Sequence, residues 1–344
     1  MPSLPEDVLI EILEWVYRAS QTKKIDYPTL CAASLVCRSW QPLTQRLLFR
    51  RVQQRHGDVH LLIDIFQQNR SLGQHVRALT VQSDNALDTT TLLEFCPYII
   101  ELKLKGPWSR SLSYRLDHVT SRLRALDLHI AVLDVGHNLD VSALLQLWPS
   151  VQFLLLSSGY RRAWSHHPST SLRGLKITAT LFYSRVIDTI IPSNLDTLRE
   201  IEVDDDIPFQ PLTPPITRLL TRVGPRLTSL SGPYPPHVGL HEHLGSLEQV
   251  IFCALPNTPY TFPKHVRHVG YHRHETGEPF EISELPKFLV ALEILPHLQL
   301  VTVTRALQED VLATLETMCR PRGVEFFVYP DAESFRRSRN VDWI

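Results

Sequence analysis

Two cysteines, Cys31 and Cys37, lie six residues apart in the stretch LCAASLVCRSW, with Trp40 three residues beyond the second. Thiolates bind structural zinc ions and act as redox nucleophiles, so this pair is the first candidate for chemistry. The spacing is not that of a CxxC motif, and no second cysteine pair lies nearby. Because a free cysteine is commonly a small buried hydrophobe, we interpret both cysteines as packing residues.

Two histidine-rich segments, 237–243 and 265–274, are the next candidates for a metal site. Histidines four residues apart chelate a metal when they share a helix face, but the first segment begins in a turn predicted over 235–239 and the second contains a strand. The acidic run 204–206 lacks the alternating ligands and the glycine of a calcium loop. No phosphate-binding glycine loop or nucleophile motif occurs, so we predict no metal, no cofactor and no enzyme.

The composition is that of a globular protein, with 43% hydrophobic and 21% charged residues among 344. A formal charge of −1 argues against general nucleic-acid binding. The five scattered cysteines do not form a secreted disulfide framework. The acidic N-terminal stretch is unlike a signal peptide, and no apolar run is long enough for a membrane span. We expect an intracellular protein of the cytosol or nucleus, bound to neither membrane nor nucleic acid.

Three short helices are predicted in the first fifty residues, and they must position the cysteine stretch. Ser3 and Glu6 form a capping box for the first helix, and Asp26 precedes the second. Three such helices cannot bury all of their apolar side chains among themselves. The surplus must contact the rest of the chain or a partner. The inner stripe of the second helix is predicted to hold Leu30, Ala33 and Cys37.

The segments LPEDVLIEILEWV and LCAASLVCRSWQPLTQRLLFRRV together resemble an F-box. In that family a helical hairpin docks on a Skp-type adaptor, which joins it to a cullin ubiquitin-ligase scaffold. Trp40 would be the anchor, because a large aromatic side chain in a desolvated pocket dominates such interfaces. The resemblance implies that the adaptor contacts are Leu4, Pro5, Ile12, Leu35, Val36, Cys37 and Trp40.

After residue 70 the pattern apolar-x-x-apolar-x-apolar recurs eleven times, with starts between 19 and 32 residues apart. The copies are 76–81, 99–104, 123–128, 151–156, 172–177, 198–203, 227–232, 247–252, 266–271, 298–303 and 324–329. Four copies follow a helical segment and a proline at 97, 149, 225 or 296, which predicts a unit of helix, proline stop and short strand. An ordinary α/β fold explains this alternation but not the recurring register.

This repeated unit resembles the divergent leucine-rich repeats of F-box proteins that are abundant in fungi. The resemblance implies an α/β protein: an N-terminal three-helix F-box followed by a leucine-rich-repeat solenoid, with parallel strands on the concave side and helices on the convex side. We expect the F-box over 1–52, a helical linker over 53–75 packed through Leu62, Ile65 and Phe66, repeats over 76–330 and a solvated tail over 331–344. The usual Asn or Cys after the strand is missing, so the solenoid should be irregular.

Residues between the apolar positions of each strand should face outward on the concave side. They change from basic to acidic along the stack and end with histidines. Phe153 and Leu155 are apolar exceptions, which either a loop covers or a bound segment contacts. The candidate substrate-facing residues are Glu101, Lys103, Lys105, Asp127, His129, Phe153, Leu155, Lys176, Glu200, Glu202, Asp204, Gln249, His268 and His272.

These features favour a non-catalytic substrate-recognition subunit of a cullin-type ubiquitin ligase. Its partners would be a Skp-type adaptor, a cullin reached through that adaptor, and a protein substrate held by the repeats. A repeat scaffold that uses the F-box outside a ligase is the alternative. An enzyme with an unrecognised site would require a deep polar pocket in place of a groove.

Overall fold

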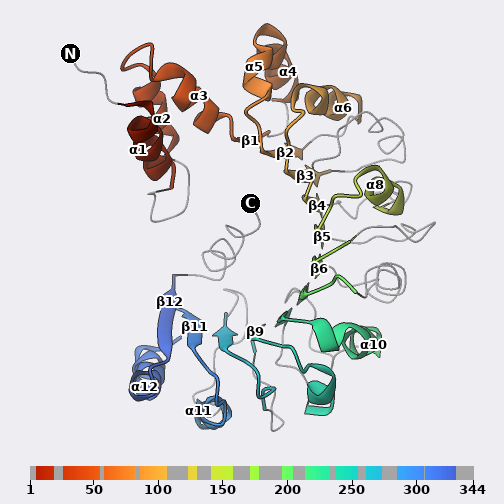
Figure 1. Ribbon diagram of the computed structural model, residues 1–344, viewed down its shortest axis with the longest axis vertical. Coiled ribbons are helices and arrows are strands. Elements are labelled where there is room, and N and C mark those ends of the chain that lie inside the picture. Colours follow the sequence, from red (N-terminus) through yellow and green to blue (C-terminus); the bar gives the residue numbers. More distant parts are fainter. Residues whose placement is uncertain are drawn as a thin grey trace. The chain divides into compact units, whose positions relative to one another are not determined.

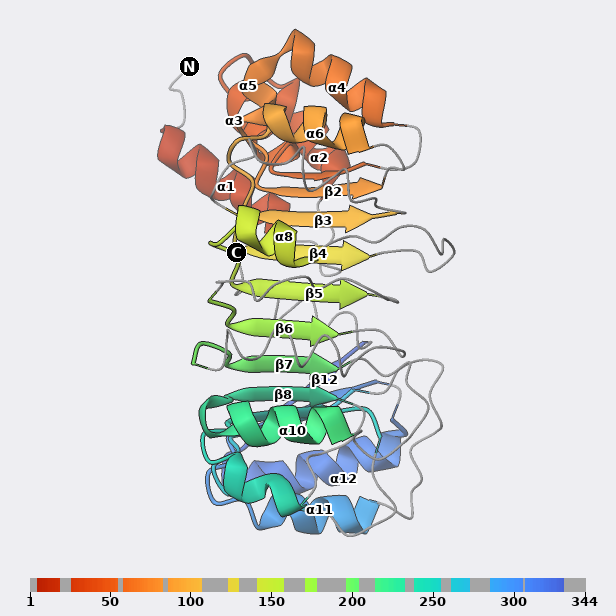
Figure 2. The ribbon, with the colours of Figure 1, turned by 90° about the vertical axis from the view of Figure 1, so that its right-hand side faces the viewer.

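The computed structural model describes residues 5–18, 26–54, 58–82, 86–106, 123–129, 141–157, 171–177, 196–203, 214–232, 238–254, 261–272, 285–305 and 307–330. The chain forms two compact units, residues 1–151 and residues 152–343. Both are mixed α/β and hold parallel strands with helices beside them (Figures 1 and 2).

Unit 1 begins with three helices, α1 (Glu6–Arg18), α2 (Tyr27–Ser34) and α3 (Gln41–Leu48). Its strands pair in sequence order: β1 (Arg51–Gln53), β2 (Ala78–Gln82), β3 (Glu101–Lys105) and β4 (Ala125–His129). The other helices are α4 (Val59–Gln68), α5 (Arg70–Gly73), α6 (Ala86–Phe95) and α8 (Val141–Leu147). Helices α4, α5 and α6 lie on one side of the strands (Figure 1).

The described part of unit 2 repeats this arrangement with eight parallel strands, also paired in sequence order. They are β5 (Phe153–Ser157), β6 (Gly174–Ile177), β7 (Glu200–Val203), β8 (Ser229–Gly232), β9 (Gln249–Phe252), β10 (His268–Tyr271), β11 (Leu300–Thr304) and β12 (Glu325–Tyr329). The helices are α10 (Pro214–Val223), α11 (Leu285–Glu293) and α12 (Glu309–Cys319), with 3-10 turns η1 (Gly224–Arg226), η2 (Val238–His243) and η4 (Arg320–Arg322). The α-helices lie on one side of the strands (Figure 1).

Each of the eleven predicted copies contains a strand, so this prediction is confirmed. Within each unit the fourth residue of one copy pairs with the fourth residue of the next as far as Val301, as in Leu79 with Leu102 and Leu154 with Leu175. The predicted register of the last copy, 324–329, is wrong by one residue, because Val301 pairs with Phe326 and Phe327 is exposed. The fourth positions from Leu79 to Val301 and most sixth positions are buried, because side chains two apart share one face of a strand. The third and fifth residues therefore lie on the opposite face, which we call the open face.

Four helices also end where the positions of the prolines predict an end. The helices α6, α8, α10 and α11 end at Phe95, Leu147, Val223 and Glu293, two or three residues before the prolines at 97, 149, 225 and 296. Sequence analysis missed one strand, β1. Its three residues, RVQ, bury only Val52 and carry no copy of the repeated pattern.

Main-chain hydrogen bonds link successive copies just before each strand. Within each unit, as far as the copy at 298–303, the carbonyl of the second residue of one copy accepts from two N–H groups of the next: Arg173 O accepts from Arg199 N at 2.8 Å and from Glu200 N at 2.9 Å. The carbonyl of Arg267 does the same with the N–H groups of Gln299 and Leu300. This ladder satisfies the backbone at the start of the strands without side-chain help.

Candidate interaction surfaces

Helices α1, α2 and α3 enclose a small hydrophobic core. Leu9 and Leu13 of α1, Leu30 of α2 and Leu47 of α3 are buried together. Partly buried side chains complete this core: Val16, Tyr17, Ala33, Trp40, Leu43 and Leu48. The core is small because each helix contributes only one or two fully buried residues.

Helix α2 begins as predicted. Asp26 Oδ1 accepts from Thr29 N at 3.1 Å, and Asp26 Oδ2 accepts from Thr29 Oγ1 at 2.7 Å. These hydrogen bonds lower the pKa of the Asp26 carboxyl group, the bond from the Thr29 hydroxyl most. Ser3 of the predicted capping box at α1 lies outside the described residues.

Several large apolar side chains remain outside this core. Val8, Ile12 and Trp15 lie on one stripe of α1 and are exposed, Trp15 by 71%. Leu35 is 86% exposed and Val36 62% exposed, in the turn between α2 and α3. We call these five residues the apolar docking surface. Exposure of so many large apolar side chains in one small helical group is typical of an interaction site.

Six of the seven predicted adaptor residues fall into three groups: exposed, half-buried, and outside the described residues. Ile12, Leu35 and Val36 belong to the apolar docking surface, and Pro5 is exposed before α1. Trp40 is half-buried against the helical core. Its side chain therefore stabilises the fold and is only partly available for contact with an adaptor. Leu4 lies outside the described residues. The exposed Val8 and Trp15 were not selected from the sequence, although their spacing with Ile12 is helical.

Both cysteines of the opening stretch are exposed, so neither is the small buried hydrophobe that a free cysteine commonly is, and packing of Cys37 against a partner stays a prediction. Helix α2 ends at Ser34, and Cys37 lies beyond it instead of on its inner stripe. Cys37 Sγ and Ser39 Oγ are 3.1 Å apart. This hydrogen bond is the main reason that the pKa of the Cys37 thiol is lowered, and main-chain N–H groups add to it. Among the described residues, no three His, Cys, Asp or Glu side chains are placed to bind a metal ion.

The helical group is joined to the strands of unit 1 by polar and aromatic contacts. Arg50 lies 3.6 Å from Glu14 of α1 and stands over the ring of Tyr17, and Tyr27 donates to the Arg51 carbonyl at 3.1 Å. Burial raises the pKa of Tyr17.

Helix α4 adds a buried aromatic contact to this joint. Its Phe66 is fully buried between Phe49, after α3, and Phe95 of α6, with ring centroids 6.1 and 6.4 Å away. Phe66 packs as predicted. The buried residues beside it are Val59 and Ile63, while the expected Leu62 and Ile65 are half-buried.

On the open face of unit 1, the candidate substrate-facing charges pair with neighbours. Arg51 lies 3.4 Å from Glu101, and Lys103 forms an ion pair with Asp127 on the next strand. Lys105 is half-buried at the end of β3. The side chain of His129 lies outside the described part of the structure.

The open face of β5 to β7 shows the same pairing. Lys176 Nζ and Glu202 Oε1 are 2.6 Å apart, and Glu200 is half-buried. Phe153 is buried, and a Cβ added to Gly174 on the next strand would lie only 2.6 Å from its ring, so the ring rests on that glycine. Leu155 is half-buried. Asp204 lies outside the described residues.

A row of polar side chains crosses the open face from β8 to β11. Ser229 Oγ donates to Gln249 Oε1 at 2.8 Å, and the Gln249 amide nitrogen donates to His268 Nδ1. His268 Nε2 is hydrogen-bonded to Thr302 Oγ1 at 2.8 Å. Thr302 Oγ1 is also hydrogen-bonded to His272 Nε2 at 2.9 Å. The candidate residues Gln249, His268 and His272 are therefore positioned by bonds to one another.

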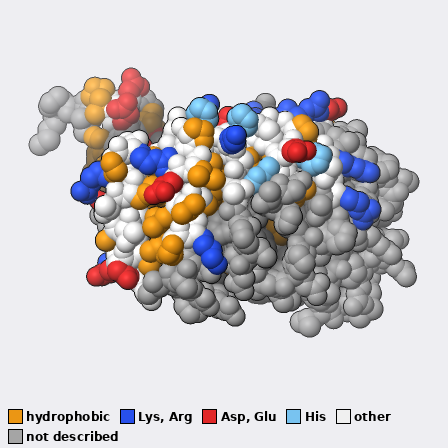
Figure 3. Space-filling view, turned by 90° about the horizontal axis from the view of Figure 1, so that it is seen from below, with side chains coloured by type: hydrophobic (Ala, Val, Ile, Leu, Met, Phe, Trp, Pro, Cys, Tyr) orange, Lys and Arg blue, Asp and Glu red, His pale blue; other side chains and the backbone are white. Residues whose placement is uncertain are grey.

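The end of the molecule that carries α11 and α12 mixes hydrophobic side chains with charged and histidine side chains (Figure 3). On α11, Val290 and Ile294 are exposed one helical turn apart. Two exposed apolar residues are normal for a globular surface. No described helix is both long and apolar enough to cross a membrane.

Residues 1–55 match the F-box-like family model, so the chain carries an F-box-like domain at its N-terminus. No curated protein matches the chain. Among solved structures, the chain is similar to a protein of Bacteroides fragilis at 13% identity and a TM-score of 0.43. The match covers 83% of this chain and 74% of that one.

Proposed function

We propose that the chain is the substrate-recognition subunit of a cullin-type ubiquitin ligase, acting in the cytosol or nucleus. The observation that carries this proposal is the F-box-like domain together with its apolar docking surface. In this proposal an F-box over 1–52 binds a Skp-type adaptor, and residues 53–75 link it to leucine-rich repeats over 76–330. A short tail over 331–344 follows them.

The adaptor would bury Ile12, Leu35 and Val36. Burial of apolar surface is the main favourable term in such associations, and a residue that is exposed in the free chain gains most from it. Trp40 contributes at the edge of this contact while it holds α3 on the core. Pro5, Cys37 and Leu4 complete the proposed contact.

The ligase role requires no chemistry from this chain. By holding a substrate and, through the adaptor, a cullin scaffold, it raises the effective concentration of a substrate lysine near the charged ubiquitin-conjugating enzyme. In the repeats, the ordered side chains of the open face would contact the substrate. The cross-strand ion pairs and the histidine row hold those side chains in fixed positions, which favours selectivity over affinity.

Co-purification of the full chain with a Skp-type adaptor tests this function. The wild type should form a stable complex, and a variant with Leu35→Ser and Val36→Ser should not. Leu61→Ser, which alters an exposed leucine of α4, is the matched control and should bind normally. If the folded wild type does not bind the adaptor, the proposed ligase function is wrong and a non-ligase repeat scaffold becomes the favoured function.

A further inference from the structure

Arginine recurs at one position of the repeated pattern, directly after the first apolar residue. Five of the eleven copies carry it there, in the dipeptides VR or LR. The position lies in the turn that leads into each strand, and we call the row of these turns the strand-entry edge. In unit 2 the recurring arginines are Arg173, Arg199 and Arg267.

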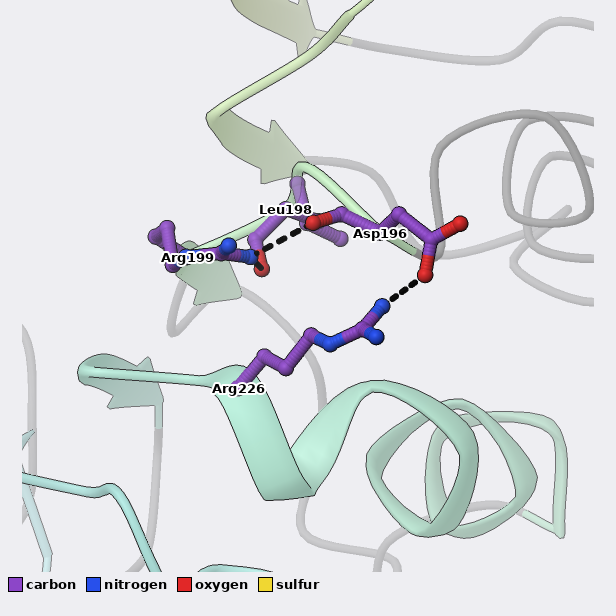
Figure 4. A network of polar contacts seen from close by, with 4 residues as sticks. All are labelled: Asp196, Leu198, Arg199 and Arg226. Atoms are coloured by element: carbon purple, nitrogen blue, oxygen red, sulfur yellow. Dashed lines mark hydrogen bonds and ion pairs between the residues drawn. The ribbon is translucent and has the colours of Figure 1, made fainter.

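The guanidinium of Arg199 is held in place by its own turn (Figure 4). Its Nη1 donates to the carbonyls of Asp196 and Leu198, both at 3.0 Å. Arg226, from the next copy, forms an ion pair with the Asp196 carboxylate. Only one nitrogen of Arg199 is used in these bonds, so donors remain for an anion.

Basic side chains outnumber acidic ones on this edge. Among the described turns of unit 2 there are seven Lys or Arg residues and three Asp or Glu residues, in a chain whose formal charge is −1. The basic set is Arg173, Arg199, Arg226, Lys264, Arg267, Arg320 and Arg322, and the acidic set is Asp196, Glu248 and Glu325.

Arginines that bind the carbonyls at helix ends account for only part of this excess of basic residues. Arg322 donates to the carbonyls of Leu292 and Leu295 at 3.0 and 2.8 Å, which satisfies the end of α11. Arg173 and Arg267 are exposed, and their side chains make no hydrogen bond or ion pair with the described part of the chain.

We propose that the strand-entry edge of unit 2 binds an acidic polypeptide segment. Guanidinium groups pair with carboxylates through two parallel hydrogen bonds, and Arg173 and Arg199 hold the same position of two successive copies. The formal charge of −1 argues against a general nucleic-acid binding surface, which favours a polypeptide over nucleic acid. That this segment belongs to a ubiquitination substrate rests on the proposed function, but the binding itself does not.

Binding of a fluorescein-labelled poly-L-glutamate peptide to the full chain, measured by anisotropy without adaptor, tests the proposal. The variant R173E/R267E is compared with R218E/R305E, which reverses two exposed arginines off the edge, on α10 and after β11. We expect the wild type and the control variant to bind. The edge variant should bind about tenfold more weakly or worse, since each exposed pair contributes modestly and reversal adds repulsion.

Equal affinities for both variants, no binding by the wild type, or tighter binding of a single-stranded DNA oligonucleotide would each overturn the proposal. Thermal melting of both variants checks that they fold, and R173Q/R267Q replaces the edge variant if it does not. Adaptor binding is measured on the same samples. If the wild type does not bind the adaptor, the ligase function is refuted, but the proposal that the strand-entry edge binds an acidic segment is not affected.

Discussion

Replacement of Leu35 and Val36 by serine should separate adaptor binding from folding. Both side chains are exposed in the free chain and add little to the helical core. The double variant should therefore keep the unfolding free energy of the wild type to within about 0.5 kcal/mol, as is usual for surface substitutions. Its affinity for a Skp-type adaptor should fall sharply.

The exposed fractions set the size of that fall. Leu35 has 86% and Val36 62% of its surface available for burial. Full burial of one such side chain contributes about 1.5–3 kcal/mol. Scaled by these fractions, the two together contribute about 2–4 kcal/mol, which corresponds to a roughly 30- to 1000-fold change in Kd.

Isothermal titration of the purified chain with the adaptor gives the affinity, and urea denaturation gives the stability. Trp40→Ala is the informative contrast, because Trp40 packs on the core and should cost about 2–3 kcal/mol of stability as well as affinity. A serine double variant that binds within twofold of the wild type would refute the assignment of this surface. A large loss of stability in that variant would refute the claim that the two side chains are free for a partner.

Three further outcomes follow from buried and exposed groups. Phe66→Ala should lower the unfolding free energy by about 3–5 kcal/mol in urea, while Leu61→Ala on the exposed side of the same helix should change it little. Maleimide should label exposed Cys37 in the native chain but reach Cys96 only after unfolding, because burial raises the pKa of Cys96 to about 12; mass spectrometry of labelled peptides distinguishes the two. Ser39→Ala should shift the pH of half-maximal Cys37 labelling upward, since loss of the hydroxyl that stabilises the thiolate raises the pKa of Cys37, and an unchanged pH profile would contradict this.

The repeated strands were predictable because burial and pattern have the same cause. Two inward side chains, two residues apart on a strand, must be apolar, so Leu79 and Val81 mark a strand in the sequence itself. The helix ends were predictable because proline cannot continue a helix. Strand β1 was not, since its single buried residue, Val52, leaves no alternation to detect.

The position of Cys37 was not predictable from helical spacing. The prediction extended the helical spacing of α2 as far as Cys37. In the structure the N–H groups of Leu35 and Val36 donate three residues back, to the carbonyls of Ala32 and Ala33. The last turn is therefore a 3-10 turn, and the helix ends there. No glycine or proline marks that end in the sequence. The cross-strand partners of Lys176 and His268 also depend on side-chain directions, which the types of residue alone do not determine.

The two proposed surfaces would rely on different physics, and this difference would suit a protein that keeps one partner and exchanges another. The apolar docking surface would gain its affinity from burial of side chains such as Leu35, which salt screens little. Exposed arginines such as Arg173 act over a Debye length of about 8 Å at physiological ionic strength, where they speed encounter more than they prolong the complex. A tightly held adaptor combined with a quickly exchanging acidic segment would allow one assembled complex to act on many successive polypeptides.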